Sequence, residues 1–434
     1  MPVLSTIGAM AARGFGWLYK ATATGAGLYA WGDNTYGQLG DGTTVGKSSP
    51  IQVGALTTWT SVGAVGPTGS ATSYAIKSDG TLWAWGYASG GQLGNGTTAP
   101  NKSSPIQIGA LTTWSLINGN GVGAHAIKTD GTLWTWGANP YGSLGTGDTT
   151  SYSSPVQVGA LTNWAFVAGT GYSAAAIKTN GTLWAWGWGT VHNVGNASAV
   201  YDAGYSTPTA GSVYTDNSSP VQIGTSTNWA SLSVGGWKHA LAVKTDGTLW
   251  AWGYNINGQC GIETLNNPYV YTPSAASFCN NPFDYYTGTY SYVTAQNPVY
   301  PFECDAAYVT WTDVPSNTIL WGFSSPVQVG ALTTWSKVAA GLYHSLAVKT
   351  DGTLWSWGVN LNGELGTGGP STSSPVQVGA LTTWATVYAG WYVSYAIKTN
   401  GTLWAWGDNS KGQLGDGTLI ASTAPKRVGS SVGW

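Results

Sequence analysis

The sequence predicts an all-β protein, a seven-bladed β-propeller built from four-stranded antiparallel blades. Three observations predict this fold: a Trp-Gly element recurs seven times, each recurrence lies within strand-like patterns, and the two ends of the chain resemble parts of one blade. Successive elements are 54, 51, 50, 66, 105 and 49 residues apart. A period of roughly 40 to 50 residues is typical of propellers, solenoids and repeat arrays. The recurring glycine is found at Gly32, Gly86, Gly137, Gly187, Gly253, Gly358 and Gly407.

Each repeat predicts a β-hairpin. The segment TLWAWG alternates large and small residues over a strand-length window, and AIK or AVK before it supplies a shorter apolar alternation. The dipeptide between the two strands favours a two-residue type I′ turn, in which both central residues need positive φ. This dipeptide is Asp-Gly or Asn-Gly and begins at Asp79, Asp130, Asn180, Asp246, Asp351 and Asn400.

Two further strands complete each repeat. One follows a proline as PVQVG or a close variant, and proline at the first residue of a strand suits an edge position. The other begins at the tryptophan of ALTTW or its equivalent. Four strands in each period, without helical periodicity, favour a propeller blade over a solenoid coil. The prolines are Pro50, Pro105, Pro155, Pro220, Pro326, Pro375 and Pro425, and the tryptophans are Trp59, Trp114, Trp164, Trp229, Trp335 and Trp384.

The two ends predict a closed ring. Pro425 to Trp434 repeats the spacing of Pro50 to Trp59, so the C-terminal segment leads into another first strand, and residues 14–32 resemble the remainder of that blade. An open solenoid would instead need polar caps. We expect residues 1–16 to be an N-terminal arm or the first strand of the closing blade. Residues 17–434 are expected to form one propeller domain with loop insertions at about 188–217 and 254–323. A degenerate eighth blade using NTILWG at residues 317–322 is the alternative for the longer insertion.

Composition argues against two classes of partner. Net charge is −2, and arginine occurs only at Arg13 and Arg427, so the chain lacks a basic footprint for a phosphate backbone and we expect no nucleic-acid partner. No apolar run approaches the roughly 18 residues that cross a bilayer, and the opening residues lack the pattern of a secretion signal. We therefore expect no membrane insertion.

These repeats resemble the regulator of chromosome condensation repeat family. The resemblance covers about residues 27–428 apart from the two insertions, and it rests on the hairpin, the Trp-Gly element and the GQLG-like loop. It implies a seven-bladed propeller but no single function, because members include an exchange factor for the GTPase Ran, a plant UV-B photoreceptor and bacterial inhibitors of β-lactamases. The acidic wedge expected of the exchange factor and the arginine network of the photoreceptor are absent. The stretch GWKH at residues 236–239 is similar to the photoreceptor's tryptophan-bearing motif and occurs once.

Sequence variation among the repeats predicts where binding occurs. One face of an up-and-down propeller would carry the monotonous KTDGT and GALTTW connections, whereas the other would carry varied loops and both insertions. Varied loops on a rigid scaffold usually display binding residues, and aromatics with a few polar groups suit protein hot spots or sugar stacking. Equally, such aromatics could cap the core, and His239 and His344 could make a structural hydrogen bond. The candidate binding residues are Tyr172, Trp237, Lys238, His239, Tyr343, His344, Trp391 and Tyr392.

Other chemistry has weaker support in the sequence. We identify no catalytic set, no metal-ligand set and no cofactor motif. Asp41 and Asp416, in GDG loops, are interpreted as solvated turn acids, and the hairpin lysines as edge charges that oppose aggregation. Cys260 is interpreted as a small buried hydrophobe, while Cys279 and Cys304 could form a disulfide.

For function, the sequence leads us to expect a non-enzymatic adhesive or structural protein on a phage virion. The charge-poor composition, the lack of an export signal and a short resemblance of STIGAMAARGFGW to tailed-phage structural proteins motivate this expectation. As a fibre, tail or capsid-associated appendage it would act in host attachment or assembly. Its partners would be other virion proteins and a host surface receptor or glycan, and a homo-oligomer within such an assembly is compatible with the sequence. The alternative is a bacterial surface or intracellular protein-binding propeller, inhibitor-like in mode, at the cell surface or in the cytoplasm.

Overall fold

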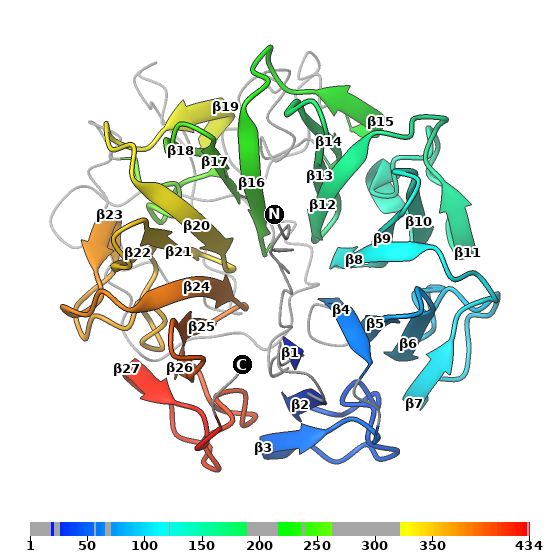
Figure 1. The fold of residues 1–434 in the computed structure, drawn as a ribbon, viewed down its shortest axis with the longest axis horizontal. Helices are drawn as coiled ribbons and strands as arrows, with labels where there is room; N and C mark the ends of the chain where they lie inside the picture. Colours follow the sequence, from blue (N-terminus) through cyan, green and yellow to red (C-terminus); the bar gives the residue numbers. More distant parts are fainter. Residues whose placement is uncertain are drawn as a thin grey trace, which may run out of the picture.

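The protein is an all-β propeller whose sheets are arranged around a common centre (Figure 1). The computed structural model describes residues 19–20, 27–55, 58–65, 71–120, 122–188, 216–236, 239–262, 322–431 and 434. Within these residues, six sheets have four antiparallel strands and one sheet has three. The same part of the chain contains one short 3-10 helix, η1 (Pro140–Gly142), and none of its helices is long and apolar enough to cross a membrane.

The sheets are numbered here in chain order. Sheet 1 contains β1 (Tyr19–Lys20), β2 (Leu28–Gly32) and β3 (Lys47–Gln52). Sheet 2 contains β4 (Trp59–Val65), β5 (Thr72–Lys77), β6 (Leu82–Gly86) and β7 (Lys102–Gln107). Sheet 3 contains β8 (Trp114–Asn120), β9 (Gly123–Lys128), β10 (Leu133–Gly137) and β11 (Tyr152–Gln157). Sheet 4 contains β12 (Trp164–Thr170), β13 (Ser173–Lys178), β14 (Leu183–Gly187) and β15 (Asn217–Gln222).

The remaining three sheets repeat the same order. Sheet 5 contains β16 (Trp229–Gly235), β17 (His239–Lys244), β18 (Leu249–Tyr254) and β19 (Gly322–Gln328). Sheet 6 contains β20 (Trp335–Ala340), β21 (His344–Lys349), β22 (Leu354–Gly358) and β23 (Thr372–Gln377). Sheet 7 contains β24 (Trp384–Ala389), β25 (Val393–Lys398), β26 (Leu403–Gly407) and β27 (Ser422–Arg427). The proline-bearing strand lies at an edge of every sheet, as the sequence predicts.

The hairpin turns differ from the predicted type I′. In sheet 2, Gly80 N–H donates to Lys77 O at 2.9 Å and Lys77 N–H donates to Thr81 O at 3.0 Å, which gives a three-residue loop. Only Gly80 has positive φ, at 77°, and Asp79 does not. The Asp79 carboxylate instead accepts hydrogen bonds from the amide and hydroxyl of Thr81. The loop therefore has three residues, and only its last one, the glycine, has the left-handed conformation. A type I′ turn has two loop residues, both with positive φ, so the type I′ prediction is wrong.

Buried tryptophans join one sheet to the next. The tryptophan before the recurring glycine is fully buried in all seven sheets, and in six of them its indole N–H donates to a backbone oxygen in the preceding sheet's loop. Trp85, for example, donates to Gln38 O at 2.9 Å. Trp31 of sheet 1 donates to Gln413 O of sheet 7 at 2.8 Å, so the same contact joins the last sheet to the first.

Trp434 occupies the place of a first-strand tryptophan beside sheet 1. Its N–H donates to Gly401 O at 3.0 Å, as Trp114 N–H donates to Gly80 O at 3.1 Å. Its ring packs edge-on against Tyr29 and Trp31, with centroids 5.7 and 6.1 Å away. The two ends of the chain therefore contribute to one packed cluster.

The hairpin lysines are not free edge charges. Lys128 Nζ lies 3.4 Å from the ring centroid of Trp134 and 4.9 Å from that of Trp114. The same pair of rings accompanies the other hairpin lysines, so each ammonium rests on aromatic faces by a cation–π contact. The edge-charge interpretation is wrong, because two tryptophan rings lie beneath each of these lysines. One ring comes from the start of the first strand, and the other is the first tryptophan of the LWAWG-type strand.

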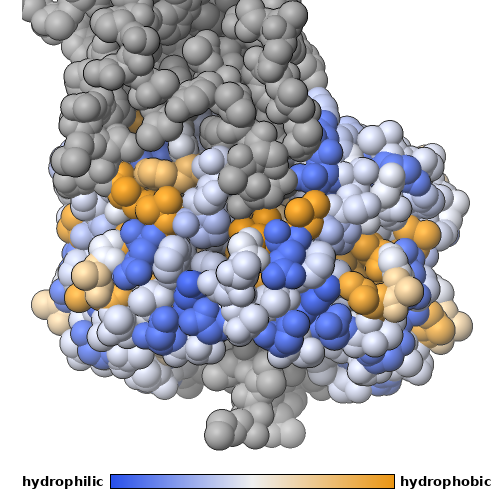
Figure 2. All heavy atoms as spheres, turned by 90° about the horizontal axis from the view of Figure 1, so that it is seen from above, coloured by the Kyte–Doolittle hydropathy of each residue, from blue (hydrophilic) through white to orange (hydrophobic). Residues whose placement is uncertain are grey.

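Several sequence expectations fall outside the described residues. These are the N-terminal arm of residues 1–16, most of both insertions, and the cysteines Cys279 and Cys304. Of the NTILWG stretch considered for an eighth blade, Gly322 is described; it begins β19 and pairs with Tyr254 in sheet 5. Along the outer flank seen in Figure 2, hydrophobic and hydrophilic residues occur in small separate patches.

Candidate functional site

Two sets of connections face in opposite directions, as the repeat comparison predicts. Hairpins between second and third strands and the connections between sheets form the constant face. The loops between first and second strands, and between third and fourth strands, form the variable face. The constant face carries one exposed leucine in each of four inter-sheet connections, Leu111, Leu161, Leu332 and Leu381. Of the sequence-predicted candidates that the structure describes, Tyr172, Tyr343, Trp391 and Tyr392 lie in loops between first and second strands, and His239 and His344 begin second strands.

The two candidate histidines are buried and join neighbouring sheets. His239 Nε2 lies 3.0 Å from Ser345 Oγ, and His344 Nε2 lies 2.9 Å from Ser394 Oγ. Ser345 Oγ donates its proton to Gln259 O at 2.7 Å, so the histidine nitrogen must be the donor to the serine. Burial lowers the pKa of both histidines to about 3, which keeps the rings neutral.

This geometry confirms the structural interpretation of the histidines. A general base must accept the proton of its nucleophile, whereas His344 donates to Ser394 and Ser394 donates to Glu364 O at 2.7 Å. The unprotonated Nδ1 of each ring is buried without a hydrogen-bond partner. The pairs therefore connect blades and are not arranged as activated nucleophiles.

Of the other candidates, Trp391 is 6% exposed, so it caps the core and is poorly placed to meet a partner from solvent. Its backbone oxygen accepts a hydrogen bond from Leu342 N–H at 3.2 Å, across the boundary between sheets 6 and 7. Trp237 and Lys238 lie outside the described residues. Tyr343 and Tyr392 are half-buried at sheets 6 and 7, and their backbone oxygens accept from the residue that follows each Trp-Gly element.

Tyr172 belongs to a three-ring aromatic cluster on the variable face. Its ring packs edge-on against Tyr141, with centroids 5.3 Å apart, and against Trp188 at 6.0 Å. Tyr141 and Trp188 are stacked at 5.5 Å with an interplanar angle of 28°. All three rings are partly exposed, and they come from three loops of sheets 3 and 4. We call Tyr141, Tyr172 and Trp188 the aromatic cluster.

Sequence reasoning identified Tyr172 and missed the other two rings. Trp188 directly follows the Trp-Gly element of sheet 4, where Tyr87 stands in sheet 2. Tyr141 takes the loop position that Tyr36 takes in sheet 1, and Tyr36 packs against Tyr87 with centroids 5.1 Å apart. Comparing the repeats at these two positions would have found both pairs.

Tyr141 also has an unusual backbone. Its φ is 62° and its ψ is 19°, and it is the only non-glycine residue with positive φ in the described part of the chain. Such a conformation costs on the order of 1 kcal/mol and clusters at functional sites. Tyr36 makes the corresponding ring contact without it.

The GDG-loop acids are structural rather than solvated. Asp416 Oδ1 accepts from the amide and hydroxyl of Thr418 and from Asn409 Nδ2, and Oδ2 pairs with Lys426 Nζ at 2.5 Å. Burial alone would raise the pKa of Asp416, but the hydrogen bonds of Lys426 and Thr418 outweigh it and lower the pKa to about 2. Among the described residues, no three His, Cys, Asp or Glu side chains are grouped as metal ligands would be.

Cys260 is fully buried in the slot that leucine fills in most repeats. Burial raises the pKa of its thiol, which removes the thiolate form at neutral pH. The interpretation of Cys260 as a small buried hydrophobe is confirmed.

Family models described as the regulator of chromosome condensation (RCC1) repeat match the chain. One matches residues 26–66, 79–117, 130–177, 351–397 and 400–433, and a second matches residues 229–259, 335–364 and 384–413. The ultraviolet-B receptor UVR8 of Arabidopsis thaliana is 26% identical over 352 residues, which is 80% of this chain and 63% of that protein. The human E3 ubiquitin-protein ligase HERC2 is 33% identical over 138 residues, 30% of this chain and 3% of that protein.

Two solved structures share the fold. Human WBSCR16 aligns with a TM-score of 0.69 at 16% identity, covering 93% of each chain. Prp20p of Saccharomyces cerevisiae, which was studied for its binding to Gsp1p and histones, aligns with a TM-score of 0.68 at 18% identity, covering 95% of this chain and 88% of that one. These identities show the fold alone.

The comparisons correct the expectation of a phage virion appendage. The similar proteins are a plant photoreceptor, ligases and a yeast protein that binds Gsp1p and histones, and none of these is a fibre or tail protein. The expected partners, virion proteins and a host receptor or glycan, are wrong for the same reason. The expectation was wrong because it took the charge-poor, glycine-rich composition as a sign of a virion protein. That composition follows from the many tight turns and buried tryptophans of the repeat itself.

Proposed function

Because the chain belongs to the regulator of chromosome condensation repeat family, we propose that it is a non-enzymatic protein-binding propeller that works inside a cell. The yeast relative Prp20p binds the proteins Gsp1p and histones and has been seen bound to Kap60, which makes a protein the most natural class of partner here. The chain spans 63% of the ultraviolet-B receptor and 3% of HERC2, so neither protein's full activity is transferred.

We propose seven blades, with sheet 1 completed by the C-terminal segment. The hydrogen bond from Trp434 N–H to Gly401 O and the packing of Trp434 on Tyr29 and Trp31 support this arrangement. In sheet 2, Trp59 makes the equivalent edge-on contact with Trp83 at 6.0 Å. A closed ring fixes each loop of the variable face relative to the next, so a partner can meet several blades without ordering them first.

The aromatic cluster carries the proposal. Tyrosine and tryptophan are enriched at interface hot spots because they bury large areas at small entropic cost while keeping a polar group. Here three such rings from two sheets converge on the face where loops vary. The strained backbone of Tyr141 supports a role beyond packing, since Tyr36 packs in the same place unstrained.

Paired surface variants test this function. Tyr172→Ala and Trp188→Ala remove rings of the aromatic cluster, whereas Leu161→Ala removes an exposed side chain from the constant face. With the full chain as bait in lysate of its source cells, we expect the two cluster variants to lose the captured protein by about tenfold or more. Leu161→Ala should retain it. Equal capture by all variants of unchanged thermal stability would reject the aromatic cluster as the binding site.

A further inference from the structure

The aromatic cluster repeats a ring arrangement that the chain uses elsewhere to hold a cation. On the constant face of sheet 4, the rings of Trp164 and Trp184 meet edge-on, with centroids 5.9 Å apart and planes at 79°. Lys178 Nζ lies 4.7 and 3.5 Å from these two centroids. On the variable face of the same sheet, Tyr172 and Trp188 meet edge-on at 6.0 Å and 84°. The second pair of rings therefore has the arrangement that binds an ammonium group in the first.

The rings of the cluster are held in place and reach the solvent. Trp188 N–H donates to Tyr172 O at 3.0 Å, and the Tyr141 ring stacks on Trp188. All three residues are partly exposed. A cation from a partner would meet an ordered aromatic surface, which lowers the entropic cost of binding.

Asp148 lies beside the cluster. A Cβ atom on Gly142, next to Tyr141, would stand 2.4 Å from the Cα of Ser218. Gly147 N–H, next to Asp148, donates to Ser218 O at 2.7 Å. Tyr141 and Asp148 therefore each adjoin a glycine that packs on the same residue of β15.

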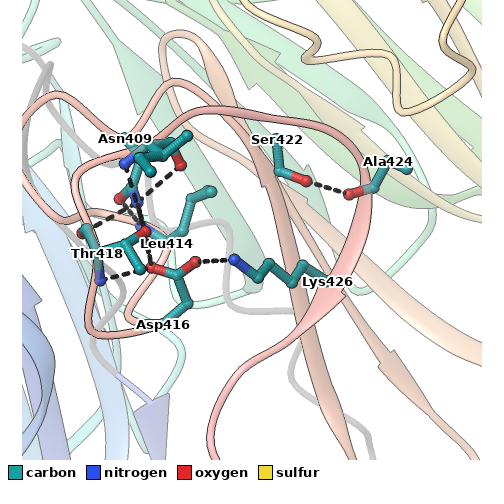
Figure 3. A network of polar contacts seen from close by, with 8 residues as sticks. Asn409, Leu414, Asp416, Thr418, Ser422, Ala424 and Lys426 are labelled. Carbon is teal, nitrogen blue, oxygen red and sulfur yellow. Dashed lines mark hydrogen bonds and ion pairs between the residues drawn. The ribbon is translucent and has the colours of Figure 1, made fainter.

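Asp148 is a charged carboxylate with neutral partners. Its oxygens accept hydrogen bonds from the hydroxyls of Thr146 and Tyr152, at 2.8 and 2.9 Å. The Thr146 hydrogen bond contributes most to lowering the pKa of Asp148 below its ordinary value, so the group is ionised at neutral pH. In sheet 7 the loop acid Asp416 pairs instead with Lys426 (Figure 3). In the part of the chain that the structure describes, Asp148 has no such ion pair.

The charged side chains around the cluster are carboxylates. In the variable-face loops of sheets 3 and 4, as far as the structure describes them, the charged residues are Asp148 and Asp216. Gly187 pairs with Asn217, so Asp216 lies opposite Trp188, which follows Gly187. No lysine or arginine occurs in these described stretches.

Lysines occur on the variable face of neighbouring sheets. Lys102 begins β7 of sheet 2, and its neighbour Ser103 accepts a hydrogen bond from Gly42 N–H of sheet 1 at 2.7 Å. Lys102 therefore lies at the boundary of sheets 1 and 2, whereas the aromatic cluster lies at the boundary of sheets 3 and 4. Lys238, which precedes β17, lies outside the described residues.

We propose that the aromatic cluster binds a basic segment of its partner protein, an inference that rests on the proposed function of the cluster. A lysine or arginine side chain lies on the rings of Tyr172 and Trp188, and a second basic residue lies beside Asp148. The ring faces attract the first cation through their quadrupole, and the carboxylate attracts the second. Single-stranded nucleic acid also stacks on exposed rings, but here Asp148 would face its phosphates.

Three substitutions each remove one part of this site. Tyr172→Leu and Trp188→Leu keep apolar bulk and lose a ring face. Asp148→Asn loses the charge and keeps an oxygen for the Thr150 N–H, which the carboxylate accepts at 3.0 Å.

Matched controls make the same changes elsewhere. Tyr87→Leu removes the ring that follows the Trp-Gly element of sheet 2, where Ala71 O accepts the Tyr87 N–H and stands in the place of Tyr172. Asp79→Asn removes an exposed carboxylate on the constant face, at a position where sheets 4 and 7 have asparagine.

The probe is a short fluorescein-labelled peptide that repeats Gly-Arg-Ser, measured by anisotropy with the full chain. We expect saturable binding that weakens as salt is raised. Affinity should fall about tenfold for either ring variant and about threefold for Asp148→Asn, and it should be unchanged for both controls. A peptide with citrulline in place of arginine, which keeps the shape and loses the charge, should bind much more weakly.

Several results would overturn the proposal. These are absence of binding at low salt, equal binding of the citrulline peptide, equal binding by the ring variants, and preference for a single-stranded oligonucleotide. If the arginine peptide fails to bind while Tyr172→Leu and Trp188→Leu still lose the protein captured from lysate, the basic segment is wrong and the proposed function stands.

Discussion

Replacing Glu364 by glutamine should change how the stability of the ring depends on pH. Glu364 is 1% exposed and stands in the loop position that glutamine fills in sheets 1, 2, 5 and 7. In sheet 7, Gln413 uses both ends of its amide, accepting from Lys411 N–H at 2.8 Å and donating to Asp408 Oδ2 at 2.8 Å. Glu364 accepts from Asn362 N–H at 2.7 Å, but its Oε1 has no hydrogen-bond partner.

The magnitude follows from the carboxyl's proton affinity. Burial, with a smaller contribution from Asp408, raises the pKa of Glu364 from 4.5 to about 7, against the effect of backbone hydrogen bonds. The folded protein holds this proton more tightly than the unfolded chain does. The contribution of protonated Glu364 to the free energy of unfolding is therefore fully present below pH 4.5. It falls as pH rises from 4.5 to about 7 and is constant above that. At about 1.4 kcal/mol for each tenfold change in affinity, the loss at pH 8 is about 3 kcal/mol.

Urea unfolding followed by tryptophan fluorescence, at pH 4.5 and pH 8, measures this difference. All other titrating groups are shared, so subtracting wild type from Glu364→Gln isolates the one carboxyl. We expect the variant to be about as stable as wild type at pH 4.5 and about 3 kcal/mol more stable at pH 8. Parallel pH profiles for the two proteins would refute the reasoning, because they would mean that Glu364 ionises in the folded ring without cost.

Three further predictions concern packing. Trp434→Ala should lower the free energy of unfolding by about 3 to 5 kcal/mol by removing the ring that packs on Tyr29 and Trp31, with Trp434→Phe losing less. Trp391→Ala should cost about 3 kcal/mol in the same urea assay, and an unchanged midpoint would mean that the side chain is exposed in solution. Lys178→Met keeps the aliphatic stem but loses the ammonium 3.5 Å from the Trp184 centroid; a loss of about 1 kcal/mol is expected, and none would show that packing alone holds the stem.

The sequence predicted the strands well because each one is marked by short-range chemistry. Alternation identifies TLWAWG, and Asp-Gly identifies the hairpin, so the order of strands within a sheet followed directly. The turn type did not follow, because Asp-Gly occurs in two-residue and three-residue loops alike. The two loop lengths are distinguished by the hydrogen bond from Lys77 N–H to Thr81 O, the last bond between the two strands of the hairpin. Its position depends on the residue at which strand pairing ends.

Burial at the site was harder to predict than its location. Trp391 and Tyr172 stand in equivalent loops, yet one caps the core and the other joins the aromatic cluster. Their surroundings differ: Leu342 of sheet 6 donates its N–H to Trp391 O, whereas the rings of Tyr141 and Trp188 lie beside Tyr172. The sequence of one repeat does not show which residues of the next repeat pack against it.

The lysine error has the same origin. Read along the chain, Lys178 is a charge at the end of a strand, which suits an edge. In space, two tryptophans of sheet 4, Trp164 and Trp184, come from strands on either side and bring their rings beneath it. Cross-strand neighbours decide the role of such a residue.

The central claim, that the variable face binds a protein partner through the aromatic cluster, is tested most directly by mapping the contact. A photo-crosslinking phenylalanine analogue placed at Tyr172 would probe the variable face, and one placed at Leu161 would probe the constant face of the same molecule. After irradiation in source cells, we predict a covalent adduct to one protein from the Tyr172 position and none from Leu161. Equal adducts from both positions, or an adduct from Leu161 alone, would contradict the account.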